Sequence, residues 1–365
     1  MNTTIRSRNY QVHLGDDALH QVEKYLTSNA RIIASRKIIL VDDNTMGHCL
    51  PKLHEATISL RDAVVLEIPN GETSKSIDTI AGLWQQLTEI GADRNSVLVN
   101  LGGGVVSDIG GFTAATYMRG IHFINLPTTL LSMVDASVGG KNGINFGGYK
   151  NQVGTFDEPG AVFVWPDFLK TLSSNELRSG FAEVIKHAII SDQNKWNEVS
   201  GIENFDSVNW IEIIKESIWT KNKIVNSDYR DKHLRKSLNF GHTIGHALES
   251  YSQKKHSPVL KHGEAIAIGM IGEIFLSEKL CGLNKVMADE ICRFIARHYP
   301  LSFHFENEEL LGLIKGDKKN ESHQVNFSLI RSIGEPAINQ HVDEALILQA
   351  LDFCREQMAS MSKIT

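Results

Sequence analysis

Two histidines stand four residues apart in the stretch LNFGHTIGHALES, whose pattern predicts a helix. His242 and His246 would lie on one face of it, one turn apart, where they could offer two nitrogens to one metal ion. A catalytic divalent site needs three protein ligands and an open position. Glu183 in GFAEVIKHA and His262 in LKHGEAIAIGM are further candidates. Spacing alone favours His242 and His246 with either Glu183 or His262, although a single histidine on an apolar helix is more often a core residue.

Glycine is concentrated in one segment: thirteen of the 29 glycines lie between Gly102 and Gly160. The run LGGGVVSDIGG directly follows the apolar run SVLVNL, so the backbone there could approach a pyrophosphate at the start of a helix. A tight turn with packing glycines explains any single one equally well. Ser107 stands where the third glycine of G-x-G-x-x-G would be, and the strand-end acid Asp42 precedes the glycines by some 60 residues. A nucleotide site is therefore predicted, but not an ordinary dinucleotide fingerprint.

Cations recur among small residues in the same segment, as Arg119 in MRG, Lys141 in GGKNGIN and Lys150 in GYKNQVG. Exposed lysines are usually solvated surface, but lysines flanked by glycine and asparagine in an apolar segment more often bind an anion. Asp135 in LLSMVDASVGG could orient a hydroxyl group. These residues indicate a small phosphorylated or carboxylated substrate.

Composition narrows the class of protein. The chain has 365 residues, a hydrophobic fraction of 42% and a net charge of −6, with basic residues in small clusters. We therefore expect two domains and neither a nucleic-acid nor a membrane partner. The four cysteines show no paired spacing, the N-terminus resembles a strand, and no apolar run approaches a membrane span. These features predict a cytoplasmic protein.

Predicted elements change character near residue 170. Before it, short β-rich runs alternate with amphipathic stretches such as 76–92, which predicts a largely parallel sheet with helices on both faces. The predicted strands are 37–42, 63–68, 96–101, 122–127 and 161–166. After it, the predicted helices are 176–191, 208–226, 237–253, 262–280, 286–298 and 343–358, the first with capping-box spacing between Ser173 and Glu176. The predicted domains are residues 1–170 and 171–365.

Long motifs resemble the 3-dehydroquinate synthase family of sugar-phosphate cyclases over essentially the whole chain. They are LGGGVVSDIGGFTAATYMRGIHFINLPTTLLSMVDASVGGKNGINFGGYKNQVGTF, GFAEVIKHAIISD, LRKSLNFGHTIGHALES, KHGEAIAIGM and DKKN. The resemblance implies that family's fold: a Rossmann-like α/β N-terminal domain with a mostly parallel sheet, and an all-α C-terminal domain.

The resemblance also implies the cofactors, NAD and one divalent metal ion, Zn²⁺ or Co²⁺. By matching positions, the metal ligands would be Glu183, His242 and His262, and His246 would contact substrate. This assignment revises the pairing expected from spacing, because only one histidine of the pair would bind the metal ion. The other would face the bound molecule, where an imidazole can hydrogen-bond a phosphate or share in proton transfer.

Further positions follow from the same match. The implied NAD site comprises Asp42, Glu72, Lys75, Gly103, Gly104, Val105, Asp108, Thr128, Thr129, Leu131, Lys141, Lys150, Thr171, Leu172 and Glu176. The implied substrate residues are Asp135, Lys141, Asn151, Lys186, Lys221, Arg235, Asn239, His246 and one lysine of DKKN, Lys318 or Lys319. Arg119 would reach the site of a partner subunit, so a homodimer is implied.

The implied substrate is 3-deoxy-D-arabino-heptulosonate 7-phosphate, and the implied product is 3-dehydroquinate, in the shikimate pathway to aromatic amino acids. The reaction would combine a transient NAD-dependent oxidation, loss of phosphate, re-reduction and an intramolecular aldol closure, with no net redox change. Anionic intermediates need nearby positive charge, which the lysines, Arg235 and the metal ion would supply.

One position departs from the family pattern, since Asn142 stands in GGKNGIN where the family usually has threonine. Both side chains form hydrogen bonds, so we expect a local adjustment around Lys141 and the same reaction. Three alternatives rank below this interpretation: a sister sugar-phosphate cyclase such as aminodehydroquinate synthase, a metal-dependent polyol dehydrogenase, and a non-catalytic binding protein. Arg235, Lys221 and the intact GGKNGIN segment favour an acidic substrate over the neutral ones of most sister cyclases.

Overall fold

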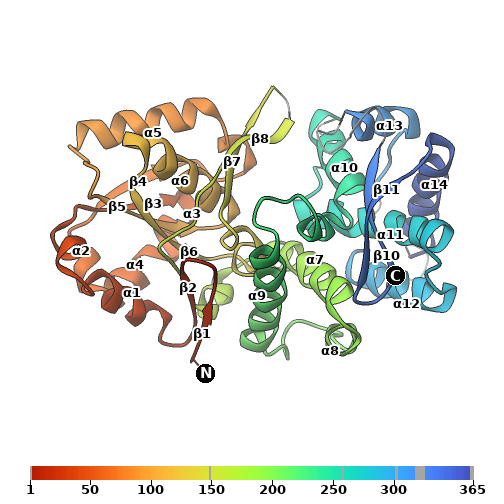
Figure 1. Cartoon of the computed structure of the whole chain (residues 1–365), viewed down its shortest axis with the longest axis horizontal. Helices are drawn as coiled ribbons and strands as arrows, with labels where there is room; N and C mark the ends of the chain where they lie inside the picture. Colours follow the sequence, from red (N-terminus) through yellow and green to blue (C-terminus); the bar gives the residue numbers. More distant parts are fainter. Residues whose placement is uncertain (1, 148, 256–258, 301–302, 317–324, 362–365) are drawn as a thin grey trace. The chain divides into compact units, whose positions relative to one another are not determined.

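The computed structural model describes residues 2–147, 149–255, 259–300, 303–316 and 325–361 (Figure 1). The chain forms two compact units. The first consists of residues 1–177 and 209–226, and the second of residues 178–208 and 227–365. In the described part of the chain, no helix combines the length and the apolar character that crossing a membrane requires.

A seven-stranded sheet forms the centre of the first unit. Its order is β1 (Asn2–Arg6), β2 (Gln11–Gly15), β9 (Ala161–Val164), β6 (His122–Pro127), β5 (Val97–Gly102), β3 (Lys37–Asp42) and β4 (Val64–Ile68). Only β1 and β2 pair antiparallel, and the other neighbours are parallel. The mostly parallel sheet expected from the sequence is confirmed. Strand β9 stops two residues early because Pro166 begins a 3₁₀ turn.

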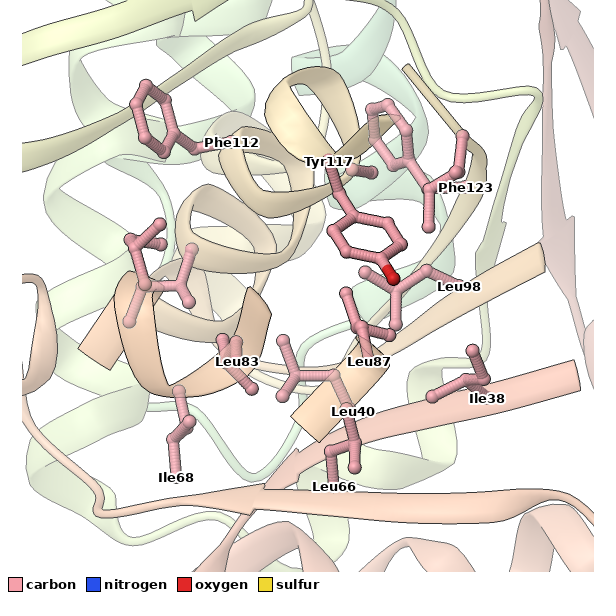
Figure 2. Close-up of a cluster of buried hydrophobic side chains, with 14 of the residues drawn as sticks. Ile38, Leu40, Leu66, Ile68, Leu83, Leu87, Leu98, Phe112, Tyr117 and Phe123 are labelled. Carbon is pink, nitrogen blue, oxygen red and sulfur yellow. The ribbon is translucent and has the colours of Figure 1, made fainter. Parts of the chain in front are cut away.

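Both faces of this sheet are buried. Ile38 and Leu40 of β3 pack in a cluster with Leu83 and Leu87 of α5 (Ile77–Glu89), as Figure 2 shows. Ile39, between them, is also fully buried and must point to the opposite face. Near-continuous apolar strands of this kind are typical of parallel sheets covered on both sides.

The remaining helices of the first unit are assigned as follows: α1 (Ala18–Leu26), α2 (Ala30–Ala34), α3 (Asp43–His48), α4 (Leu50–Ala56), α6 (Gly104–Thr116) and α9 (Trp210–Ser227). Helix α9 belongs here although it is distant in sequence. Its Asn222 donates to the backbone oxygen of Arg6 at 2.8 Å and accepts from the hydroxyl of Ser7 at 2.7 Å. A hairpin of β7 (Lys141–Phe146) and β8 (Tyr149–Phe156) completes the unit.

Helices dominate the second unit, as predicted. They are α7 (Ser174–Ser191), whose first residues belong to the first unit, α8 (Gln193–Ser200), α10 (His242–Lys255), α11 (His262–Cys281), α12 (Lys285–His298), α13 (Asn307–Lys315) and α14 (Glu344–Met361). The unit also contains a hairpin that the all-α expectation did not include, formed by β10 (Asn326–Ser332) and β11 (Glu335–His341).

Helix α10 begins later than the sequence pattern predicts. Residues 237–241 are not part of it, because the 3₁₀ segment η6 (Leu234–Asn239) comes first and Gly241, just before the helix, has a left-handed backbone (φ +80°). His242 is consequently the first helical residue. The same chain reversal presents the backbone N–H groups of residues 241–244 at the start of the helix.

Candidate functional site

The second unit gathers one carboxylate and two imidazoles. Glu183 on α7 is fully buried, and its Oε1 lies 3.5 Å from Nε2 of His242 and 3.5 Å from Nε2 of His262. Donor atoms of all three residues lie within 4.8 Å of one another. Two donors bound at about 2.1 Å to one tetrahedral zinc ion would be roughly 3.4 Å apart. The geometry and the donor types therefore fit a divalent metal ion.

Contacts behind the two imidazoles orient them toward Glu183. Nδ1 of His242 lies 3.1 Å from the backbone oxygen of Phe240, and Nδ1 of His262 lies 3.3 Å from Oε2 of Glu249. Each contact leaves Nε2 facing the carboxylate of Glu183. Outer partners of this kind fix the tautomer and the ring orientation of metal-binding histidines.

Charge is concentrated around these residues. Burial disfavours the imidazolium form of His262, but the carboxylates of Glu249 and Glu183 outweigh burial and raise its pKa to about 9. Lys186 lies one turn after Glu183 on α7, and its ammonium forms a buried ion pair with Oε2 of that carboxylate. A proton on His262 and a metal ion compete for the same place, because a ligating imidazole must be neutral.

His246 borders this group without belonging to it. Its ring centroid lies 5.1 Å from that of His242 and 6.1 Å from that of His262, and its side chain is half-buried. Helical spacing does place it one turn from His242, yet the group within ligand distance consists of Glu183, His242 and His262. His246 is thus positioned beside the metal-binding group.

Two further predicted substrate residues lie on the 3₁₀ segment η6 that precedes α10. Arg235 is buried and donates from Nη1 to the backbone oxygen of Tyr229 at 2.7 Å. Its own backbone N–H donates to Oδ2 of Asp228 at 3.1 Å. Asn239 ends the segment and is half-buried. The turn that holds Arg235 is therefore anchored by Asp228.

In the first unit, several predicted NAD residues lie at the carboxyl ends of parallel strands. Asp42 ends β3 and caps α3, accepting from the backbone N–H of Thr45 at 2.8 Å. Gly102 ends β5, and Gly103 caps α6. Strand β4 lies on one side of β3 and β5 on the other. The chain thus changes winding direction between β3 and β5, which is where open α/β sheets bind ligands.

Glycines at this edge of the sheet leave space next to the backbone that a side chain would fill. A Cβ added to Gly103 would lie 3.1 Å from Cγ2 of Thr129, and one added to Gly104 would lie 3.4 Å from Cβ of Ala136. The backbone N–H of Thr128 donates to the oxygen of Gly102 at 3.0 Å. Backbone N–H groups at the start of the 13-residue helix α6 suit a pyrophosphate. These residues fit a dinucleotide.

Five predicted residues of the first unit form one polar network. Lys75 is almost fully buried and donates to Oδ2 of Asp108 at 2.7 Å and to Oδ1 of Asn151 at 2.5 Å. Glu72 lies 3.7 Å from Lys75 and 3.5 Å from Lys150 through its Oε1. Burial raises the pKa of Asp108, while the ammonium of Lys75 acts in the opposite direction. The network connects the turn after β4 with α6 and β8.

A second pair joins residues that are far apart in sequence. Asp135 lies on a π-helical turn, η4 (Ser132–Ala136), and Lys221 lies on α9. The ammonium of Lys221 donates to the backbone oxygen of Asp135 at 2.6 Å and to its Oδ1 at 2.8 Å. Turns of π-helix occur frequently at functional sites. The structure thus brings two of the predicted substrate residues into contact.

Asn142, the departure from the family pattern, is buried on β7 next to the exposed Lys141. Its amide donates to the backbone oxygen of Asp157 at 2.9 Å. A Cβ on Gly111 would lie 2.0 Å from Oδ1 of Asn142. The asparagine side chain therefore occupies space that a glycine on α6 leaves open, and it anchors the strand that carries Lys141.

Two of the other predicted residues, Lys318 and Lys319, fall outside the described residues. Arg119 is exposed in a turn after α6 where Met118 and Arg119 have positive φ values of 51° and 68°. The others are placed as follows: Val105 in the first turn of α6, Leu131 before η4, Thr171 and Leu172 at the end of η5 (Pro166–Thr171), and Glu176 in the first turn of α7.

Sequence reasoning missed the acids behind the histidines. Glu249 contacts His262, and Glu273 on α11 accepts a hydrogen bond from the backbone N–H of Gly241, just before His242. Glu249 lies seven residues after His242, hence on the same face of α10, which could have suggested it. Glu273 is a charged residue within the apolar run AIAIGMIGEIF, and an acid in such a run is the signal that could have identified it.

The chain matches a known family along most of its length. The profile described as "3-dehydroquinate synthase N-terminal" matches residues 65–179, and the one described as "3-dehydroquinate synthase C-terminal" matches residues 180–320. A 3-dehydroquinate synthase of Parabacteroides distasonis is 42% identical over 345 residues, which cover 93% of this chain and 96% of the relative. The 3-dehydroquinate synthase of Geobacillus thermodenitrificans is 38% identical over 366 residues, which cover 98% and 99%.

Solved structures share the fold at lower identity. A 2-deoxy-scyllo-inosose synthase complexed with carbaglucose-6-phosphate, NAD⁺ and Co²⁺ superposes with a TM-score of 0.82 at 23% identity, covering 98% of this chain and 100% of the other. A 2-epi-5-epi-valiolone synthase from Streptomyces hygroscopicus with NAD⁺ and Zn²⁺ bound also has a TM-score of 0.82 at 23% identity, covering 97% and 99%. At such identity the likeness establishes the fold.

Proposed function

The chain belongs to the 3-dehydroquinate synthase family, and from this premise we propose that it converts 3-deoxy-D-arabino-heptulosonate 7-phosphate to 3-dehydroquinate and phosphate. In this proposal it is a carbon–oxygen lyase that requires NAD and one divalent metal ion, Zn²⁺ or Co²⁺. The observation that carries the proposal is the Glu183, His242 and His262 group, located in a chain that matches the family's C-terminal profile across those residues. Its donor types suit both metals.

In this proposal the cofactors supply the redox and Lewis-acid chemistry, and the residues of the chain hold the cofactors. When bound, NAD would supply reversible hydride transfer at a secondary alcohol, and the metal ion would supply Lewis-acid polarisation of the alcohol oxygen. Glu183, His242 and His262 would hold the metal ion. Asp42, the backbone from Gly103 to Val105, and Thr128 would hold the dinucleotide at the strand ends.

Charged side chains of the protein bind the substrate and stabilise its anions. Lys186, beside Glu183, supplies positive charge next to the metal-binding group. Lys221 and Asp135 hold each other in place, so each can orient a hydroxyl or a charged group of the substrate. His246 is adjacent to the metal-binding group, and its half-buried ring can move a proton to or from a departing phosphate. These fixed charges need no reorganisation as negative charge develops.

The remaining assignments rest on the family match. We infer that Lys141, Asn151, Arg235, Asn239 and one of Lys318 and Lys319 also contact the substrate. Glu72, Lys75, Asp108, Thr129, Leu131, Lys150, Thr171, Leu172 and Glu176 complete the NAD site in this proposal. The network of Lys75, Asp108 and Asn151 supports it, because it links residues assigned to NAD with one assigned to the substrate. A cytoplasmic location fits the four cysteines, which form no disulfide in the part of the chain described.

We further infer a homodimer in which Arg119 reaches the site of the partner subunit. Its support is the exposed turn after α6, whose two consecutive positive φ values cost energy and are typical of functional positions. Mixing Arg119→Ala chains with His246→Ala chains tests the inference. A mixed dimer with Arg119 acting across the interface contains one intact site and regains activity. Mixed dimers that stay inactive would refute it.

Phosphate release from the heptulosonate 7-phosphate is the direct test. We expect release that requires NAD⁺, stops after chelation, resumes on adding Zn²⁺ or Co²⁺, and leaves no accumulated NADH. The exposed variant Lys285→Gln on α12 serves as a control for handling and should match the wild type. Absence of phosphate from folded, metal-loaded protein would favour a sister cyclase. Net NADH formation from a simple alcohol would favour a polyol dehydrogenase.

A further inference from the structure

A buried carboxylate stands at the start of the helix that carries His242. Glu273 lies on α11 and has no exposed surface. Its Oε2 accepts from the backbone N–H of Gly241 at 2.6 Å, and its Oε1 accepts from those of Thr243 at 3.0 Å and Ile244 at 3.4 Å. These donors flank His242 on both sides. The first turn of α10 is therefore held by a side chain from another helix.

Glycines let the two helices approach closely enough for this contact. A Cβ on Gly269 of α11 would lie 2.1 Å from the backbone oxygen of Gly241, and one on Gly245 would lie 2.8 Å from Cδ1 of Ile266. Residues 262, 266, 269 and 273 recur at helical spacing and thus share one face of α11. His262 and Glu273 lie at opposite ends of that face. The face that carries one ligand histidine also fixes the other.

The location of the two histidines creates an electrostatic problem. His242 is the first residue of α10 and His262 is the first residue of α11. A helix N-terminus carries a partial positive charge, so it disfavours a dication placed beside it. Glu273 puts a negative charge at the start of α10. Glu249, which is also buried, puts a negative charge next to His262. Both carboxylates offset the unfavourable field of the helix ends.

We propose that Glu273 is a positioning residue for the divalent metal ion, which fixes His242 through the backbone of Gly241, Thr243 and Ile244 and counters the positive end of α10. The inference rests on the metal site proposed above. A carboxylate that acts only as a helix cap would change stability and leave metal affinity unaltered. Metal affinity therefore distinguishes positioning from plain capping.

Glu273→Gln keeps the size of the side chain and removes the charge. It also turns one oxygen into an NH₂ group, which would face a backbone N–H that now has no acceptor. We expect the dissociation constant for Co²⁺, measured by competition with a chelator, to rise about 10- to 100-fold, as for other outer partners of metal ligands. The visible absorption bands of bound Co²⁺ should shift, since they report ligand geometry. Glu273→Asp, which keeps the charge, should recover part of the affinity.

Two matched variants make the outcome decisive. Ser277→Ala, one turn further along α11, removes a buried hydroxyl that donates to the backbone oxygen of Glu273 and accepts from the backbone N–H of Ile330. It should lower stability without altering Co²⁺ affinity. His242→Ala should lose the metal ion. Unchanged affinity and spectrum in folded Glu273→Gln would overturn the inference, whereas wild-type protein that binds no Co²⁺ would overturn the metal site itself. If Glu273→Gln does not fold, Glu273→Asp takes its place in the test. A Glu273→Asp protein with wild-type Co²⁺ affinity and an unshifted spectrum would then count against the inference.

Discussion

The two units hold their candidate ligands with different parts of the chain. In the first, backbone at the ends of β3 and β5 forms the candidate NAD site, and glycines such as Gly103 keep it accessible. In the second, side chains on helices form the metal-binding group, and a further layer of buried acids holds those side chains. A backbone site depends on the absence of side chains, whereas a side-chain site depends on their identity and orientation.

This difference determines which substitutions should matter. In the first unit, adding a methyl group at a glycine should do more harm than removing a neighbouring side chain. In the second, removing a single ligand atom should abolish binding while the fold persists. The following four predictions test this contrast, beginning with the largest expected effect.

Removing a ligand should separate the two histidines of α10. His242→Ala should raise the dissociation constant for Zn²⁺ by roughly three orders of magnitude or more, because one of three protein ligands is lost. His246→Ala should retain its metal ion and lose turnover, because its ring lies outside the metal-binding group. Metal content of the two purified variants, with chelator competition, measures both. A metal-free His246→Ala protein would instead support the pairing expected from helical spacing.

Gly110→Ala should be the most damaging of the glycine changes predicted for the first unit. An added Cβ would lie 1.9 Å from Oδ1 of Asn100, a fully buried residue of β5. We expect a loss of about 1–3 kcal/mol in the free energy of unfolding, measured with urea. Gly82→Ala is the matched control, because its Cβ on α5 would meet nothing within 4 Å. That change should stabilise by about 0.4–1 kcal/mol, and equal effects of the two would contradict the packing argument.

Local patterns predicted much of the fold, because period-2 and period-3.6 patterns follow from burial of one face or both. Strand 37–42 and the helix from His262 agree closely with the structure. The β7–β8 hairpin was missed, since its glycines and asparagines resemble a loop and only backbone pairing makes it a sheet. The β10–β11 hairpin was likewise absent from the expected all-α domain.

Only part of the candidate site could likewise be predicted from the sequence. Spacing favoured His242 and His246 with either Glu183 or His262 as metal ligands, and the family match replaced His246 by taking both Glu183 and His262. Neither reveals that Glu273 caps α10, because that contact depends on how closely α10 and α11 pack. The pairing of Lys221 with Asp135 likewise joins residues 86 positions apart. Contacts of this kind depend on tertiary packing, and no local pattern in a single sequence indicates them.

Gly103→Ala should weaken NAD⁺ binding while the fold is retained. Its Cβ would lie 3.1 Å from Cγ2 of Thr129, tight enough to shift the backbone that we assign to the dinucleotide. We expect the dissociation constant for NAD⁺, measured by calorimetry, to rise about tenfold, which corresponds to about 1.4 kcal/mol. Gly104→Ala, whose Cβ would make an ordinary 3.4 Å contact with Ala136, should have a smaller effect. The reverse order would argue against a backbone-held dinucleotide.

The smallest effect should come from Asp228, which holds backbone rather than a ligand in the second unit. Its carboxylate accepts from the N–H groups of Lys232 at 3.0 Å, His233 at 2.7 Å and Arg235 at 3.1 Å. Partial desolvation raises its pKa, but these hydrogen bonds and the charge of His233 outweigh it and leave the pKa below the ordinary 3.8. A lowered pKa in the folded state means that the contribution of Asp228 to stability is present at neutral pH and disappears as the pH falls through that value.

Asp228→Asn should therefore lower the urea midpoint slightly at pH 7, and the difference from the wild type should stay constant down to about pH 5 and shrink below about pH 4. Because Arg235 is held by the same turn, the variant should also raise the KM for the phosphorylated substrate while kcat changes little. Its metal affinity should equal that of the wild type, since Asp228 contacts no ligand in the part of the chain described. A difference in stability that persists unchanged into acid would mean that the loss does not come from the charge of Asp228, and would contradict this account of the turn.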